Sequence, residues 1–239
     1  MIILIIDKLL IRGCALQVDS SKVIELRNFS IGLPKRMKYE NDKEVNTGIC
    51  KQSTEEAFLK KEGFLGDGVA DLRYHGGPDR AVCVYPYEHY SLWEKEFEKT
   101  LPPSNFGENL TVTNMLEKDV HIGDVFRLGE AVIQITQGRV PCSTITKRTN
   151  NPFLLKRMVQ TGFTGYLCRV LEEGIVRKDS KITLLESHPK QVSILYGNEI
   201  YFHRQKDIEG IKKVLAVEEL ANEWKDMLEG RLNKDITRI

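Results

Sequence analysis

The chain has 239 residues, with 35 lysines and arginines against 34 aspartates and glutamates, and a formal net charge of +1. This balance argues against a dedicated nucleic-acid-binding protein, which carries a basic excess or patch. With 41% hydrophobic and 29% charged residues, the composition is that of a folded, soluble protein and not of a disordered one. No apolar run approaches the roughly 20 residues that span a bilayer, so we expect no membrane association.

The apolar start of the chain, residues 1–6, resembles the core of a secretion signal. It lacks a preceding positive segment, however, and Asp7 interrupts it short of the usual ~7–15 residues. We therefore expect a cytoplasmic protein. The five cysteines are an odd number without a Cys-x-x-Cys motif, which disfavours a disulfide framework and a four-ligand structural zinc site.

Strand patterns dominate the chain as far as residue 187. Short apolar runs, several of them bounded by glycine or proline, are typical of strands, and they cover residues 23–33, 81–85, 109–113, 125–128, 131–136, 166–171 and 182–185. We expect residues 34–46 to form a polar surface loop. The glycine-rich segment 55–79 should contain no long helix.

Two helices are expected between these strands. Tyr90, Trp93 and Phe97 recur at helical spacing. Asn151, followed by a proline, predicts the start of a second helix that ends at Gly162. Many short strands with long excursions predict a mainly β fold with helical excursions (α+β), built on a closed or strongly curved, barrel-like sheet rather than on alternating βα units.

The hydrophobic period changes to a helical one after residue 189. It predicts helices over residues 208–215 and 217–228, and Ser193 could cap a third. We expect Trp93 and Trp224 to lie in the core. The sequence thus divides into an extension of open status, a barrel-like domain and a small three-helix domain, over residues 1–22, 23–187 and 190–239.

The segment from Gly66 to Arg80 is the first candidate for function. Its acidic and imidazole side chains recur at every fourth position: Asp67, Asp71, His75 and Asp79. The glycines exclude the helix that would align them, but Gly76 and Gly77 would let a loop turn sharply and present N–H groups to an anion. Arg73 and Arg80 would add positive charge. The alternative is a turn in which the aspartates bond backbone donors.

Cys142 is the second candidate, because it follows a proline at the end of the strongest strand. Arg139 on one side, and Lys147 and Arg148 on the other, create a positive setting. Such a setting favours the thiolate, which attacks electrophiles or binds soft metals. Taken alone, a buried thiol at a strand end is the better supported interpretation.

Other polar residues are weaker candidates. We expect His89 and His121 to lie at the surface or at caps. Glu108 and Asn109 could line a polar site or form an ordinary turn.

Taken in order, these segments resemble the MOSC domain, named for the C-terminal domain of molybdenum cofactor sulfurases. Eight short motifs carry the resemblance over residues 23–187: Thr47-Gly-Ile-Cys-Lys51, Gly66-Asp67, Ala70-Asp71, His75-Gly-Gly-Pro-Asp79, Tyr85, Phe106-Gly-Glu-Asn109, Ile122-Gly-Asp124 and Arg139-Val-Pro-Cys142. The chain is most similar to the YiiM-like bacterial subgroup, in which a three-helix domain resembling residues 190–239 follows.

The resemblance implies a barrel-like fold that binds the molybdenum cofactor (molybdopterin). It implies an oxidoreductase that reduces N-hydroxylated compounds, such as base analogues, with Cys142 as the catalytic residue and molybdenum ligand. Electrons would come from a separate reductase, and a homodimer is a candidate assembly. The residues expected to bind the cofactor are Asp67, His75, Gly76, Gly77, Asp79, Arg80, Asn109 and Arg139.

Three alternatives stay open. Cys142 could carry a persulfide and transfer sulfur. The aspartates and His75 could serve a metal-dependent or thiol hydrolase. The protein could also carry or store the cofactor without catalysis.

Overall fold

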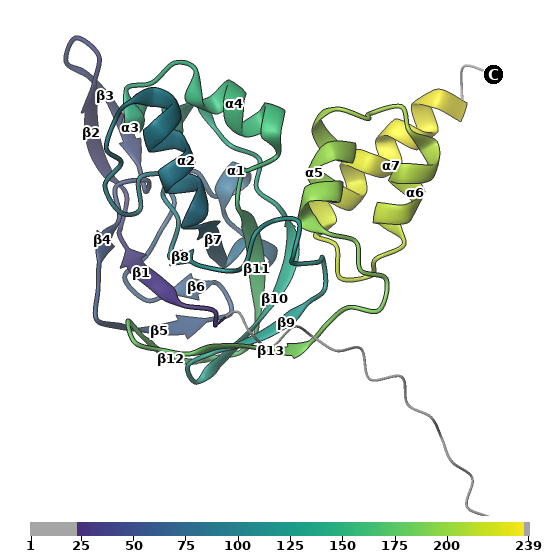
Figure 1. Cartoon of the computed structure of the whole chain (residues 1–239), viewed down its shortest axis with the longest axis horizontal. Coiled ribbons are helices and arrows are strands. Elements are labelled where there is room, and N and C mark those ends of the chain that lie inside the picture. Colours follow the sequence, from purple (N-terminus) through teal and green to yellow (C-terminus); the bar gives the residue numbers. More distant parts are fainter. Residues whose placement is uncertain (1–22, 237–239) are drawn as a thin grey trace, which may run out of the picture.

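The computed structural model describes residues 23–236, so the expected extension over residues 1–22 lies outside the described residues. The structure confirms the expected α+β class (Figure 1). A curled, barrel-like sheet is covered by helices on one side and is followed by three C-terminal helices.

Eight strands form the main sheet, in the order β13-β9-β10-β11-β7-β8-β1-β4. Neighbours are antiparallel except β7 and β8, which run parallel. The strands are β1 (Leu26–Ile31), β4 (Gln52–Ser53), β7 (Val82–Pro86), β8 (Leu110–Val112), β9 (Val125–Leu128), β10 (Ala131–Gly138), β11 (Tyr166–Glu172) and β13 (Ile182–Glu186). All seven expected strands are confirmed, because their apolar residues line the core of a curved sheet.

The polar segment 34–46 is a hairpin and not the expected loop. It consists of β2 (Lys35–Tyr39) and β3 (Lys43–Thr47). Asn41 and Asp42 have positive φ angles of 52° and 60°, as a tight hairpin turn requires and as these residue types tolerate. The loop prediction failed because the hairpin projects from the main sheet (Figure 1) and exposes most of its side chains, so its strands lack apolar alternation.

A small second sheet has the order β12-β5-β6. Its strands are β5 (Glu56–Lys60), β6 (Gly63–Phe64) and β12 (Gly174–Arg177). Strand β12 was not predicted; its partner β5 lies far away in the chain. As expected, segment 55–79 has no long helix: beside β5 and β6 it contains the single turn α1 (Leu72–His75) and the start of the 3-10 turn η1 (Pro78–Arg80).

Three helices cover one side of the sheet and enclose a second hydrophobic core (Figure 1). They are α2 (Glu88–Phe97), α3 (Ser143–Thr149) and α4 (Leu154–Thr161). The expected helix at Trp93 is confirmed, with the indole fully buried. The helix expected after Asn151 is present and ends at Gly162, but it begins at Leu154 with Phe153 as its N-cap residue. The Asn151 side chain accepts from the backbone N–H groups of Phe153 and Leu154, directly before and at the start of α4. Helix α3 was not predicted.

The chain ends in α5 (Ile194–Phe202), α6 (Ile208–Leu215) and α7 (Asn222–Ile236). Ser193 caps α5, as expected, by accepting from the backbone N–H of Tyr196. Helix α7 begins later than predicted, because Val217 and Leu220 are buried by the turn that precedes it. The expected burial of Trp224 is confirmed, and it shares one hydrophobic core with the sheet. Across residues 23–236, no helix has both the length and the apolar character to cross a membrane.

Candidate active site

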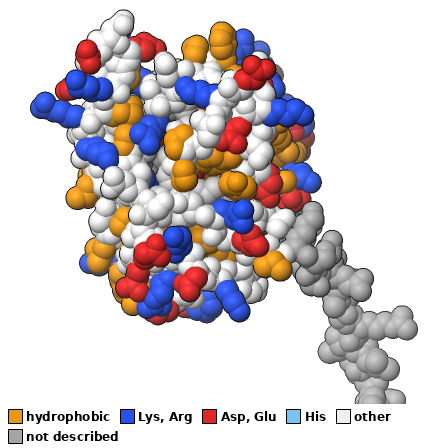
Figure 2. Space-filling model, turned by 60° about the vertical axis from the view of Figure 1, so that its left-hand side comes forward, with side chains coloured by type: hydrophobic (Ala, Val, Ile, Leu, Met, Phe, Trp, Pro, Cys, Tyr) orange, Lys and Arg blue, Asp and Glu red, His pale blue; other side chains and the backbone are white. Residues whose placement is uncertain are grey.

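A cavity of about 700 Å³ opens where loops of the main sheet meet the start of α7. Its wall takes residues, though not every residue, from segments that are far apart in the sequence: 46–51, 60–72, 75–83, 107–109 and 137–144, with Leu167 and Glu223. Of the residues expected to hold the cofactor or its metal, all except Asp79 line it. The face shown in Figure 2 carries charges of both signs, and hydrophobic side chains gather near its middle.

Cys142 lies at the junction between the sheet and the helices. Strand β10 ends at Gly138, and Cys142 is the extended residue (φ −105°, ψ 161°) directly before α3. Its thiol is partly exposed and lines the cavity. A cysteine at this position is not the fully buried strand-end thiol of the alternative interpretation.

The environment of Cys142 favours the thiolate. Burial raises the pKa of this thiol, but a hydrogen bond with His75, the positive charge of Arg139 and hydrogen bonds with Thr144 outweigh burial. Together they lower the pKa from 9.0 to about 6. The thiol is therefore mostly ionised at neutral pH.

Lys147 and Arg148 do not supply the positive charge that was expected of them. The Lys147 ammonium lies 5.0 Å from the centre of the Tyr39 ring. Arg148 donates from Nη1 to Cys50 Sγ at 3.3 Å. Both side chains leave the cavity because α3 turns them toward the second core and the hairpin. Of the three basic neighbours expected to act on Cys142, Arg139 supplies the charge and the other two do not.

Arg139 is fixed at the cavity wall. Its Nη2 donates to the Phe106 carbonyl oxygen at 2.6 Å, and its backbone N–H donates to the Gly165 carbonyl oxygen at 3.0 Å. Within residues 23–236, its buried Nη1 atom has no hydrogen-bond partner. One face of a buried guanidinium thus remains for a group that enters the cavity.

The glycine loop brings His75, Gly76, Gly77 and Arg80 to the cavity wall. Gly77 has a φ of +109°, a conformation that L side chains rarely adopt. The Arg80 Nε donates to the Gly76 carbonyl oxygen at 2.8 Å, which holds the guanidinium against the loop. Arg73 does not line the cavity, and its guanidinium pairs with Asp71 at 2.8 Å.

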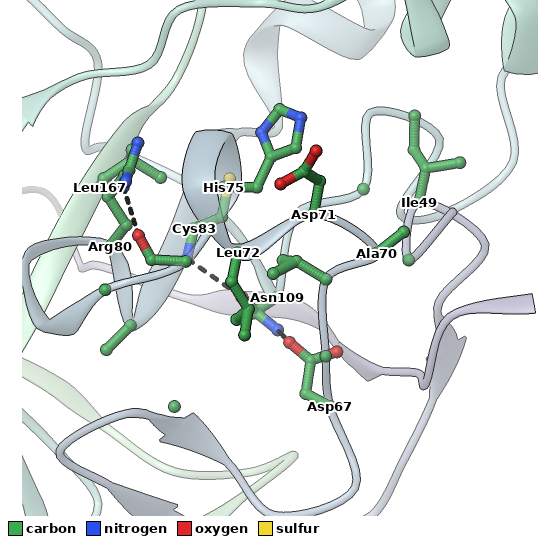
Figure 3. Close-up of a pocket in the computed structure, with 18 of the residues that line it drawn as sticks. Ile49, Asp67, Ala70, Asp71, Leu72, His75, Arg80, Cys83, Asn109 and Leu167 are labelled. Atoms are coloured by element: carbon green, nitrogen blue, oxygen red, sulfur yellow. Dashed lines mark hydrogen bonds between the residues drawn. The ribbon is translucent and has the colours of Figure 1, made fainter. Parts of the chain in front are cut away.

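Asp67 and Asn109 form a polar part of the wall (Figure 3). The Asp67 carboxylate accepts from Asn109 Nδ2 at 2.8 Å and from the Gly32 backbone N–H at 2.8 Å, and it pairs with Lys51. Asn109 Oδ1 in turn accepts from the Cys83 backbone N–H at 3.0 Å. Both side chains are largely engaged by the protein, so their main effect is to hold the wall in place.

Asp79 lies outside the cavity. Its carboxylate pairs with Arg169 at 2.8 Å and accepts from the Asn222 backbone N–H at 3.2 Å. The regular spacing of the aspartates therefore does not produce a cluster, since each carboxylate has its own basic partner. In the described part of the chain, no group of three or more His, Cys, Asp or Glu side chains is arranged to hold a metal ion.

Sequence analysis missed several wall residues. Gln137 is 1% exposed, and its Oε1 atom is buried without a partner among the described residues. It lies two residues before Arg139, so strand alternation could have found it. Cys83 and Glu223 also line the cavity. No local signal marks Glu223, which comes from α7.

His89 is buried and not at the surface as expected. Its Nε2 lies 2.7 Å from Glu117 Oε2, and its ring stacks on Phe163 with the centroids 4.4 Å apart. Glu108 is fully buried and accepts from Thr111 and Tyr90. These groups lie behind the cavity wall because α2 turns its inner face toward the sheet.

Comparisons with known proteins agree with the motifs. A family model described as "MOSC domain" matches residues 71–183, and one described as "YiiM-like, 3-alpha helix domain" matches residues 192–235. The Bacillus subtilis protein "Uncharacterized protein YflK" is 42% identical over 199 residues, which cover 83% of this chain and 90% of that protein.

A solved structure and a longer protein extend the comparison. The crystal structure of YiiM from Geobacillus stearothermophilus superposes with a TM-score of 0.75 at 30% identity, covering 87% of this chain and 99% of that one. A Gibberella moniliformis protein named "Reductase" is 37% identical over 161 residues, which cover 64% of this chain but only 28% of that protein.

Proposed function

Because the chain belongs to the MOSC domain family and to its YiiM-like members, we propose that it binds the molybdenum cofactor in the cavity and reduces N-hydroxylated compounds. The observation that carries the proposal is the Cys142 thiol, which lines the cavity with a pKa of about 6. A thiolate is a soft ligand of the kind that transition metals with sulfur-rich coordination take. The relative named "Reductase" supports the reductive chemistry.

The chemistry of the wall fits this cofactor. Pterins present hydrogen-bond donors and acceptors along one edge, and the unpartnered Arg139 Nη1 and Gln137 Oε1 are a donor and an acceptor in the described wall. At Gly77, an added Cβ would meet nothing nearer than 3.9 Å, so the loop leaves room for a group beside Arg80. A cofactor phosphate would be held there by charge.

The residues of the chain have distinct roles in this proposal. Bound in the cavity, the cofactor would supply a metal centre that exchanges two electrons. Reduction of an N-hydroxy group breaks the N–O bond, consumes two electrons and two protons, and releases water. Cys142 would hold the metal, while His75 and Arg139 keep its thiol deprotonated. We place this reaction in the cytoplasm, with a separate reductase as electron donor.

Sulfur transfer is a second candidate, supported by the two thiols of one cavity, Cys83 and Cys142. A persulfide on Cys142 would be the carried group. Mass spectrometry of the native protein would then show a sulfane adduct on Cys142 that a reductant removes.

Molybdenum content tests the proposal directly. The protein would be expressed in a host that makes the cofactor, and molybdenum per chain would be measured in the wild type, in Cys142→Ser and in the matched control Cys83→Ser. We expect near-stoichiometric metal in the wild type and the control, and loss of both metal and N-hydroxy reduction in Cys142→Ser. Full reduction by the Cys142→Ser variant would overturn the proposal.

A further inference from the structure

The C-terminal helices contribute to the cavity through the first turn of α7. Glu223 lines the cavity. The backbone N–H of Asn222 donates to the Asp79 carboxylate at 3.2 Å, and that of Ala221 donates to the Thr136 carbonyl oxygen at 3.2 Å. Asp79 belongs to the turn directly before Arg80. The start of α7 is therefore hydrogen-bonded to the glycine loop that carries Arg80, one of the basic side chains of the cavity.

Arg80 and Glu223 join these two parts by an ion pair. The Arg80 Nη1 and Glu223 Oε2 atoms are 2.6 Å apart, and the side chains are 16% and 51% exposed. The guanidinium is thus held by the Gly76 carbonyl oxygen on the loop and by a carboxylate from α7. An anionic group that approached Arg80 from the cavity would meet this carboxylate.

Leaving the Cys142 thiolate aside, basic side chains and carboxylates are equal in number in the wall when Glu223 is included. Four basic and four acidic side chains line the cavity: Lys51, Lys60, Arg80 and Arg139 against Glu62, Asp67, Asp71 and Glu223. Asp67 is committed to Lys51 in a buried pair, whereas Glu223 is half exposed. Exposed ion pairs are weak and exchange readily, so the carboxylate of Glu223 can be replaced at low cost.

We propose that Glu223 sets the charge selectivity of the cavity: it occupies Arg80 until an anionic group of a ligand exchanges with its carboxylate. The three-helix segment would then take part in ligand selection rather than serve only as a packed appendage. This inference rests on the proposed function in one respect, the use of Arg80 to hold an anionic group. Its test needs no bound cofactor.

Alkylation of Cys142 by two reagents of similar size reports the charge selectivity. The full chain, from a host that makes no molybdenum cofactor, would react with anionic iodoacetate and neutral iodoacetamide, and Cys142 modification would be followed by peptide mass spectrometry. The ratio of the two rate constants cancels differences in thiolate fraction and access. Glu229→Gln removes the same charge from an exposed position of α7 outside the cavity wall and is the matched control.

We expect Glu223→Gln to raise the iodoacetate-to-iodoacetamide ratio up to about fivefold, the range set by exposed ion pairs. Glu229→Gln should leave the ratio unchanged. In an Arg80→Met background, and equally in Arg80→Gln should the first variant fold poorly, Glu223→Gln should have no effect, because the guanidinium that Glu223 occupies would be absent.

Two outcomes would overturn the inference. The ratio could stay the same in Glu223→Gln, or it could rise equally with and without Arg80, which would indicate a general field effect. Failure of the proposed function is a separate result. If protein made in a cofactor-producing host contained no molybdenum, the alkylation ratios of the cofactor-free protein would not change.

Discussion

The thiolate of Cys142 depends on a residue that is distant in the sequence, His75. Burial alone would raise the pKa of the thiol, and the hydrogen bond with His75 is the largest of the effects that lower it, ahead of the charge of Arg139. We therefore predict that His75→Ala raises the pKa of Cys142.

The size of this change follows from the kind of bond that is lost. A hydrogen bond to a charged group contributes about 1.5–3 kcal/mol, and a pKa change of one corresponds to about 1.36 kcal/mol. The pKa should therefore move from about 6 to between about 7 and 8. At pH 7, the ionised fraction would fall from about nine-tenths to between about half and one-tenth.

The pH dependence of iodoacetamide alkylation at Cys142 measures this pKa. In the wild type, the rate should fall as pH falls through about 6, because the depressed pKa keeps the thiolate down to that pH. In His75→Ala, the midpoint should rise, and the rate at pH 7 should drop about two- to tenfold, while the plateau at high pH stays similar. His203→Ala, at an exposed histidine outside the cavity wall, is the control. An unchanged midpoint would refute the assigned role of His75.

Three further predictions concern the second thiol and two helix ends. At neutral pH, Cys142 should be alkylated before Cys83, since burial raises the pKa of Cys83; mass spectrometry showing the opposite order would contradict this. Gly162→Ala should lower the free energy of unfolding in urea by about 1–2 kcal/mol, because φ is +73° there and the new Cβ would lie 2.8 Å from a leucine methyl of α5. Ser193→Ala should lower the free energy of unfolding by about 1 kcal/mol, because it removes the cap of α5. Ser193→Thr should retain most of that stability, because threonine also caps helices.

Local patterns predicted those elements whose burial is one-sided or complete. Strand β10 is recognisable because nearly every side chain from Ala131 to Thr136 is buried in the sheet. The hairpin of β2 and β3 was not predicted, because its two strands pair their backbone groups with each other and expose most of their side chains. Asn41 and Asp42 nevertheless occupy its turn with positive φ angles. Strand β12 escaped because only its distant partner β5 makes it a strand.

The residues of the site also divide into those that local sequence predicts and those that only the tertiary structure brings together. Arg139 and Cys142 are three residues apart, and their proximity could be predicted from the sequence alone. That His75 reaches the same thiol is a tertiary fact, and so is the contribution of Glu223 from α7. The basic neighbours Lys147 and Arg148 misled because a helix, which the sequence did not reveal, directs them elsewhere. Spacing in the chain predicted the chemistry of the thiol and the effect of Arg139 on it, but not the hydrogen bond with His75.

In the segment from Ala131 to Cys142, the residues that stabilise the fold come first and the residues of the site follow where strand β10 ends. Its first half is apolar and buried, and pairs on both sides with β9 and β11. Its second half holds two buried polar atoms without partners in the described structure, on Gln137 and Arg139, and then a thiolate. Each unsatisfied buried group costs about 1–3 kcal/mol, so these residues weaken the fold where they stand. The first half of β10, which is paired along both edges, can carry that cost; pairing with β11 then holds Gln137, and a backbone hydrogen bond to the Gly165 carbonyl oxygen holds Arg139.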